Sequence, residues 1–163
     1  MTNQTELFAT VKAAEIKYKI PSVKVQLVKD SSFSSDQRPI IRNPADVASI
    51  MQSTTELLAE EHSFVLILST KNKVNAIQEL SIGSLNAAVI HPREVFKAAI
   101  LSNGAAIILV HNHPSGDPTP SPEDISLTRA LAEAGKLLDI PVLDHIIMGD
   151  GWNFKSLKEI GIL

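Results

Sequence analysis

The stretch that decides the fold is AAIILVHNHPSGDPTPSPED, residues 105–124. Its first six residues are apolar throughout and predict a buried strand that leads directly into His111. Four prolines follow and restrict the path of the loop, because proline fixes its own backbone torsion. Ser121 before Pro122 is typical of a helix start. The stretch therefore predicts a strand, a constrained loop and a helix.

Two histidines stand where this strand ends. Side chains of a strand alternate between its faces, so His111 and His113 are expected to share one face and to converge. Asp124 follows in the first turn of the next helix. Two imidazoles and one carboxylate make a three-ligand site, which leaves the fourth position of zinc open for water. The competing interpretation is structural: Ser121 and Asp124 resemble a capping box, in which Asp124 only caps the helix.

The flanking sequence alternates between helical and strand patterns, with no internal repeat. Expected in order are a helix from about Thr5 to Lys17, a strand at 23–27, a helix from Asn43 towards Glu61, a strand at 64–69, a TKNK turn, a strand at 74–82, a helix from His91 that Gly104 ends, the strand at 105–110, a helix from Ser121, a strand at 142–148 and a GDG turn. This order predicts an α/β domain, layered α/β/α, with a mixed sheet: an antiparallel hairpin and parallel crossovers.

Two of these helices carry apolar faces that should point inward. In the helix from Asn43 the face includes Leu57 and Leu58. The inward residues of the helix from Ser121 are expected to be Ile125, Leu131, Ala134 and Leu138.

Composition limits the function. The chain has 163 residues, 44% of them hydrophobic, and a formal net charge of −3. No cysteine is present, so His, Asp and Glu are the strong metal ligands that remain. The charge does not provide a basic field for nucleic acid, although lysines outnumber acidic residues in the first thirty positions. No window has the apolar length of a membrane span or a signal-peptide core, which indicates a cytoplasmic protein without membrane association.

The spacing His-x-His, seven residues, Ser, two residues, Asp is a specific pattern. Four fixed residue types at these offsets occur by chance on the order of once per million start positions. The pattern resembles the JAMM metallopeptidase motif of the JAB/MPN superfamily. The context GSLNAAVIHPREVFKAAI, HNHPSGDPTPS and LDHIIMG resembles the RadC-like family within it, over roughly residues 43–163. We therefore expect a RadC-like domain at 43–163, with a cytidine-deaminase-like architecture, and an N-terminal extension at 1–42.

The resemblance implies a role for each matching residue. His111, His113 and Asp124 are implied to hold Zn²⁺, and Ser121 to donate a hydrogen bond to the oxyanion of the tetrahedral intermediate. An upstream glutamate is implied as general base towards the water that zinc activates, then as general acid to the leaving amine. Glu61 is the best match, with Glu60 and Glu56 as alternatives. The structural alternative for Glu61 is a solvated residue at a helix end.

The other histidines have simpler interpretations. His62 and His91 flank elements, where a surface or cap role suffices. His145 lies inside a core strand, where a hydrogen-bonded buried imidazole is the ordinary outcome. Asp144 is expected to face away from His145, so that at most one of the two supports a metal ligand.

The leading hypothesis is a zinc-dependent hydrolase of peptide or isopeptide bonds, acting on an unknown protein or peptide substrate. A zinc deaminase is excluded, because His113 stands where its glutamate would be and its cysteines are missing. The alternative is a non-enzymatic protein, associated with DNA or with a mobile element, that retains a metal site. RadC-like proteins carry a historical DNA-repair label and often a helix-hairpin-helix region. No such region is recognisable in residues 1–42, which weakens a DNA-binding role. The oligomeric state does not follow from the sequence.

Overall fold

The structure is a computed structural model that describes residues 38–83 and 90–163. The helix expected at about Thr5–Lys17, the strand expected at 23–27 and most of the expected N-terminal extension lie outside the described residues.

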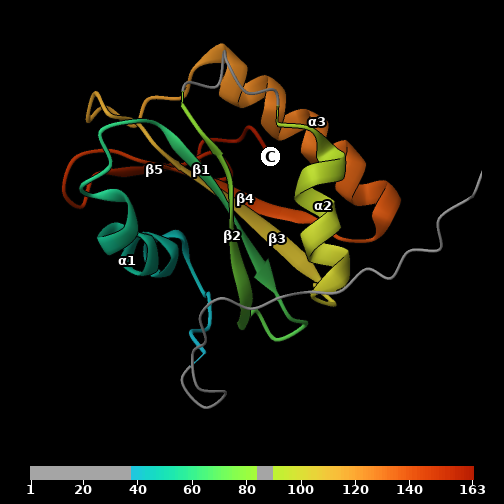
Figure 1. Cartoon of the computed structure of the whole chain (residues 1–163). Coiled ribbons are helices and arrows are strands. Elements are labelled where there is room, and N and C mark those ends of the chain that lie inside the picture. The colour runs from blue at the N-terminus through green and yellow to red at the C-terminus, as the bar shows by residue number, and fades with distance from the viewer. Residues whose placement is uncertain (1–37, 84–89) are drawn as a thin grey trace, which may run out of the picture.

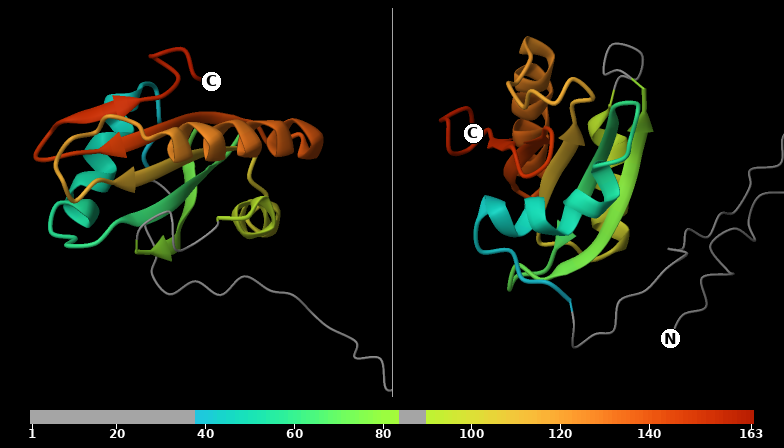
Figure 2. Two further views of the ribbon diagram at one scale, coloured as in Figure 1. Left: turned by 90° about the horizontal axis from the view of Figure 1, so that it is seen from above. Right: turned by 90° about the vertical axis from the view of Figure 1, so that its left-hand side faces the viewer.

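Within these ranges the chain folds into helices on both faces of one sheet (Figure 1). The helices are α1 (Pro44–Thr55), α2 (Pro92–Leu101) and α3 (Pro122–Leu138). The strands are β1 (His62–Leu68), β2 (Val74–Ile82), β3 (Ala106–Asn112), β4 (Val142–Met148) and β5 (Phe154–Ser156). Helix α1 covers one face of the sheet, and α2 and α3 cover the other (Figure 2). The layered α/β/α architecture expected from the sequence is confirmed.

The sheet has the strand order β2-β1-β3-β4-β5 and is mixed. Strand β1 is antiparallel to both β2 and β3, and β3 is parallel to β4. The expected hairpin is therefore β1–β2, and the β3–α3–β4 crossover is parallel as expected. Strand β5 is a short antiparallel addition to β4, formed after the turn at the GDG sequence.

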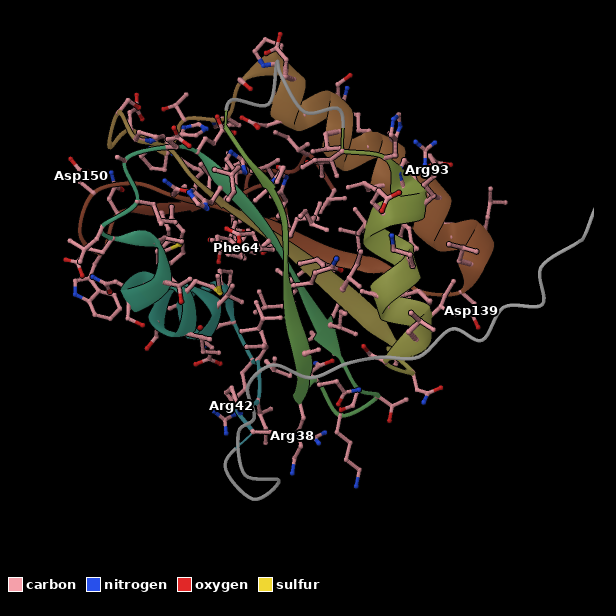
Figure 3. The ribbon with its side chains drawn as sticks, viewed as in Figure 1. Arg38, Arg42, Phe64, Arg93, Asp139 and Asp150 are labelled. Atoms are coloured by element: carbon pink, nitrogen blue, oxygen red, sulfur yellow. The ribbon has the colours of Figure 1, made fainter. Side chains whose placement is uncertain are left out.

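The sheet separates two apolar clusters. Phe64, Leu66 and Ile108 pack towards α1, whereas Val65 and Ile107 pack towards α2 and α3. The strand at 64–68 is no more than 5% exposed at any residue, so both of its faces are covered, as its continuous apolar sequence predicts. Figure 3 shows Phe64 between the sheet and α1.

Helix α1 begins as predicted but ends early. The side chain of Asn43 accepts a hydrogen bond from the Asp46 N–H at 3.0 Å, and Pro44 occupies the first turn. The helix ends at Thr55, so the prediction that it continues towards Glu61 is wrong. Thr55 donates its hydroxyl to the Met51 carbonyl, a bond typical of a weakened helix, and Leu57 is 92% exposed. The expected inward position of Leu57 is wrong as well.

The ends of α2 and α3 also differ from expectation. The left-handed residue after α2 is Asn103, with φ 50°, while the following Gly104 bonds back to the Ala99 carbonyl. After α3 the chain turns at Asp139, and Ile140 enters the core in place of Leu138, which is 45% exposed. The prediction that Leu138 points inward is therefore wrong.

No helix in these two described ranges combines the length and the apolar character needed to cross a membrane.

Candidate metal centre

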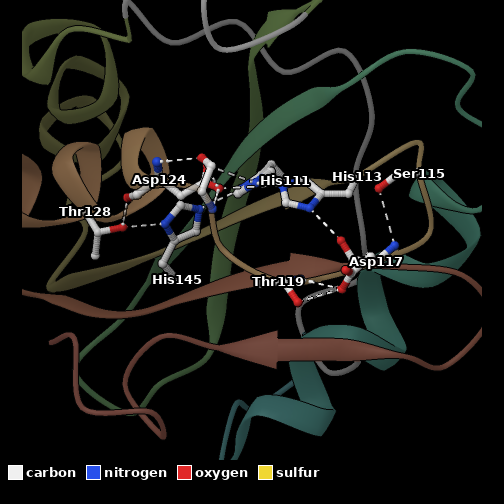
Figure 4. Close-up of polar contacts among 9 residues, drawn as sticks. His111, His113, Ser115, Asp117, Thr119, Asp124, Thr128 and His145 are labelled. Atoms are coloured by element: carbon white, nitrogen blue, oxygen red, sulfur yellow. Dashed lines mark hydrogen bonds and ion pairs between the residues drawn. The ribbon is translucent and has the colours of Figure 1, made fainter.

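The end of β3 and the start of α3 bring the three predicted ligands together (Figure 4). His111 Nε2 lies 3.0 Å from His113 Nε2 and 3.2 Å from Asp124 Oδ1. His113 Nε2 lies 3.6 Å from Asp124 Oδ2. One ligand atom from each residue lies within 4.8 Å of the others, a group that could hold a metal ion. The convergence of two imidazoles and a carboxylate expected from their spacing is therefore present.

Asp124 caps the helix and faces the histidines at the same time. Its Oδ2 accepts hydrogen bonds from the Ser121 N–H at 2.8 Å and the Ser121 hydroxyl at 2.7 Å, and Ser121 Oγ accepts from the Asp124 N–H. This is the capping box that the structural interpretation predicted. The other oxygen, Oδ1, is buried and has no hydrogen-bond partner within the described ranges. The two interpretations of Asp124 are therefore compatible, because each uses a different oxygen.

The proline-rich loop fixes the ring of His113. Its Nδ1 lies 2.7 Å from the carbonyl oxygen of Asp117. The Asp117 carboxylate in turn accepts hydrogen bonds from the backbone and hydroxyl of Thr119, which holds the loop in a turn. A carbonyl only accepts, so Nδ1 carries a proton and Nε2 is the nitrogen available to a metal.

His145 is the one of the two neighbours, Asp144 and His145, that contacts a candidate ligand, and it is buried and hydrogen-bonded as expected. Its Nε2 lies 2.8 Å from His111 Nδ1, and its Nδ1 lies 2.6 Å from Thr128 Oγ1. The contact between His145 and His111 follows from the pairing of β4 with β3, and the sequence alone does not give the register of these two strands. Asp144 makes no such contact: its carboxylate accepts hydrogen bonds from Ser156 Oγ and from the backbone N–H of Lys158.

The remaining two histidines lie elsewhere. His62 Nδ1 pairs with the Glu79 carboxylate, and His91 is the N-cap of α2 without a side-chain capping bond. Surface and cap roles therefore describe both residues.

Glu61 lies directly before β1, opposite His113. The antiparallel register pairs Ser63 with His111, so that Glu61 comes opposite His113 at the strand ends. The charge of Glu61 also contributes, after Asp124 and Asp117, to raising the pKa of His113. Glu60 and Glu56 are exposed, whereas Glu61 is half-buried. Of the three glutamates considered, Glu61 has the position that suits a proton carrier at this site.

Asn112 holds the segment around Glu61. Its Oδ1 accepts a hydrogen bond from the His62 N–H at 2.8 Å, and its Nδ2 donates to the Glu60 carbonyl at 3.0 Å. The Glu61 carbonyl accepts from the Gly83 N–H. The residue between the two histidines therefore fixes the backbone on both sides of Glu61.

Burial sets the protonation of the inner histidines. It lowers the pKa of His111 to about 4, although the charge of Asp124 opposes the shift. Burial also holds the pKa of His145 well below 6.5. Both rings are therefore neutral near pH 7, which is the form that binds a metal.

His113 and Asp124 shift in opposite directions. The hydrogen bond to Asp124 raises the pKa of His113 above 6.5, against the effect of burial. Burial acts to raise the pKa of Asp124, but the interactions with His113, His111 and Ser121 outweigh it, and the net pKa is lowered. The carboxylate is thus ionised at neutral pH.

A divalent cation fits this donor set. Two imidazole nitrogens and an ionised carboxylate face one another, and the Asp124 side chain is 0% exposed. A buried carboxylate oxygen without a hydrogen-bond donor is costly unless a cation compensates it. The His113 side chain is 17% exposed, so the site opens to solvent on its side. The group therefore offers three candidate ligands with one side open.

Comparison with known proteins gives consistent matches. The family described as "RadC-like JAB domain" matches residues 41–162. A UPF0758 protein of Desulfitobacterium hafniense (strain DSM 10664 / DCB-2) is 51% identical over 156 residues, which cover 94% of this chain and 66% of that protein. A UPF0758 protein of Caldanaerobacter subterraneus is 54% identical over 121 residues, covering 74% of this chain and 52% of that protein. The chain thus spans between about half and two thirds of these relatives.

Removing any ligand should weaken metal binding. We expect His111→Ala, His113→Ala and Asp124→Asn to lower zinc affinity at least tenfold, because two ligands do not retain the ion well. Asp124→Asn keeps an oxygen for the capping box and removes only the charge. The measurement is competition with a chromophoric chelator. His91→Ala, which removes a histidine without a side-chain capping bond, is the control. Unchanged affinity in all three variants would exclude this site.

Metal affinity should fall at acidic pH with the loss of one ligand. The raised pKa of His113 means that a proton competes with the metal below that pKa, whereas His111 stays neutral down to about pH 4. We expect zinc affinity to be full above the His113 pKa and to fall about tenfold per pH unit below it. Chelator competition at several pH values, corrected for the chelator's own protons, measures the slope. A slope of two protons near neutral pH would contradict this assignment.

Proposed function

Because this chain belongs to the RadC-like JAB domain family, we propose that it is a zinc-dependent hydrolase of peptide or isopeptide bonds. The observation that carries the proposal is the convergence of His111 Nε2, His113 Nε2 and Asp124 Oδ1, an oxygen that accepts no hydrogen bond from the described residues, at a site that is partly exposed beside His113. A zinc ion bound there would polarise the scissile carbonyl and lower the pKa of a water molecule to about 7.

Glu61 is proposed as the proton carrier. It lies on the solvent side of the site with His113, and Asn112 fixes its backbone. From this position its carboxylate takes the proton of the attacking water and then gives it to the leaving amine. The backbone is held from two sides, so the carboxylate meets the reacting atoms without a large ordering cost.

Ser121 is proposed as the oxyanion donor. In the structure the Ser121 hydroxyl donates a hydrogen bond to Asp124 Oδ2, so the hydroxyl must turn to reach a developing oxyanion. The Ser121 N–H bonds the same oxygen at 2.8 Å and keeps Asp124 in place when the hydroxyl turns. Because two separate hydrogen bonds reach this oxygen, the Ser121 hydroxyl can change partner while the Ser121 N–H still holds Asp124.

A DNA-associated accessory function remains the competing proposal. Its support is the lysine-rich opening of the chain, which lies outside the described residues. DNA binding that weakens with salt and is unaffected by a chelator, without any metal-dependent cleavage, would favour it.

Replacing Glu61 should abolish cleavage and leave the metal bound. The assay is mass spectrometry of a peptide library and of lysine-linked isopeptides, with the zinc-loaded protein and after chelation. For Glu61→Gln we expect turnover to fall about a hundredfold to ten-thousandfold with unchanged zinc content, because only the proton carrier is lost. The matched control is Glu60→Gln, which changes the exposed neighbour and should cleave like wild type. Equal rates for both variants would refute the role of Glu61.

Replacing Ser121 should lower kcat while zinc stays bound. For Ser121→Ala we expect kcat to fall about a hundredfold to thousandfold, the usual cost of one oxyanion donor. Asn43→Ala, which removes the N-cap side chain of α1 away from the site, is the control for loss of a cap. The measurements are kcat on the substrate found above and bound zinc. Zinc loss in proportion to the fall in kcat would show that Ser121 acts only through Asp124.

A further inference from the structure

A chain of buried hydrogen bonds leads from one ligand residue to another behind the site (Figure 4). Thr128 Oγ1 lies 2.6 Å from the carbonyl oxygen of Asp124 and 2.6 Å from His145 Nδ1. His145 Nε2 then lies 2.8 Å from His111 Nδ1. Thr128, His145 and His111 are 0%, 2% and 1% exposed, so water does not compete for these bonds.

We propose that Thr128 and His145 are positioning residues that hold the proton of His111 on Nδ1 and keep its Nε2 lone pair directed at the metal site. This inference rests on the proposed zinc centre and adds the groups that prepare His111 for it. Neither residue is one of the three candidate ligands: His145 bonds the far nitrogen of His111, and Thr128 bonds His145 and the Asp124 carbonyl.

The direction of the chain follows from what each atom can do. The Asp124 carbonyl only accepts, so the Thr128 hydroxyl donates to it and leaves its oxygen free to accept. That oxygen then accepts from His145 Nδ1–H. A neutral His145 consequently has its lone pair on Nε2, which accepts from His111 Nδ1–H. The lone pair of His111 is thereby placed on Nε2.

The opposite direction would block the site. If Thr128 donated to His145 Nδ1, then His145 Nε2 would carry a proton and His111 would be protonated on Nε2. That proton would lie between His111 and Asp124 Oδ1, where the two atoms are 3.2 Å apart. A protonated nitrogen cannot bind a metal. The Asp124 carbonyl, one helical turn before Thr128, favours the direction that leaves Nε2 open.

The chain also couples two ligands mechanically. Thr128 is bonded to the backbone of Asp124, and His145 to the ring of His111. Strand β4 and helix α3 therefore set the distance between carboxylate and imidazole together. Groups that orient ligating histidines in this manner typically change metal affinity 10–100-fold when removed.

The variants separate positioning from packing. Thr128→Val keeps the shape and removes the hydroxyl, so His145 Nδ1–H loses its acceptor; we expect zinc affinity to fall about 10–100-fold. Thr128→Ser keeps the hydroxyl and should bind zinc within about threefold of wild type. Thr55→Val is the matched control, because Thr55 is a buried threonine that also bonds a carbonyl four residues back, with no imidazole beside it. Its thermal stability should fall as in Thr128→Val, with unchanged zinc affinity.

The second readout is the imidazole ¹⁵N spectrum. In protein without added metal and in the zinc-bound protein, we expect His145 and His111 to carry their protons on Nδ1. An Nε2–H form of His111 without metal, or equal zinc affinity of Thr128→Val and wild type, would overturn the proposal. Wild type that binds no zinc would instead overturn the proposed function, and the ring spectra of that protein would still decide where the proton lies.

Discussion

The structure depends on one electrostatic constraint: an ionised carboxylate and two imidazole nitrogens point at one another where little water reaches them. With no cation present such a group is unfavourable, because the buried Asp124 Oδ1 accepts no hydrogen bond from the described residues. The neighbouring residues hold these three side chains in place and do not let them move apart. The capping box fixes the other oxygen of Asp124, the Asp117 carbonyl fixes the ring of His113, and His145 fixes the ring of His111. Each of these hydrogen bonds keeps a potential metal-ligand atom directed towards the centre, which is the arrangement expected of a site built around a cation.

The sequence HNH divides two tasks between the faces of β3. His111 lies on the side of α3, where it meets Asp124 and His145. Asn112 instead uses both ends of its amide to bond the backbone around Glu61. Strand alternation alone produces this division, because neighbouring side chains point to opposite faces. Three consecutive residues, 111–113, thus supply two of the three candidate metal ligands and fix the backbone around the proposed proton carrier, so a shift of β3 would move both together.

The sequence predicts the parts of this arrangement that local patterns determine. Continuous apolar runs identify β1 and β3, and proline after a capping residue identifies the starts of α1 and α3. The predicted end of α1 is wrong because Leu57 continues the helical pattern in the sequence, but the fold leaves this residue exposed. The prediction that Leu138 points inward is wrong for a related reason: the chain turns after α3 and places Ile140 in the core. His145 could not be assigned from the sequence, since its contact with His111 depends on how β4 pairs with β3. The choice between a capping role and a metal-binding role for Asp124 was not a real alternative, because one carboxylate oxygen caps the helix and the other faces His111.

The distribution of burial around the centre determines the side from which a substrate approaches. His111 is covered by His145, and the Asp124 side chain is wholly enclosed, so neither leaves room for a peptide. The His113 side chain is the partly exposed member, and the β1–β3 register places Glu61 opposite it. In the proposed function an amide would therefore enter beside His113 and meet Glu61 on the open side, while Thr128 and His145 occupy the closed side. Thr128 and His145 on the enclosed side are neutral, so the negative charges described at the centre are those of Asp124 and, on the open side, Glu61.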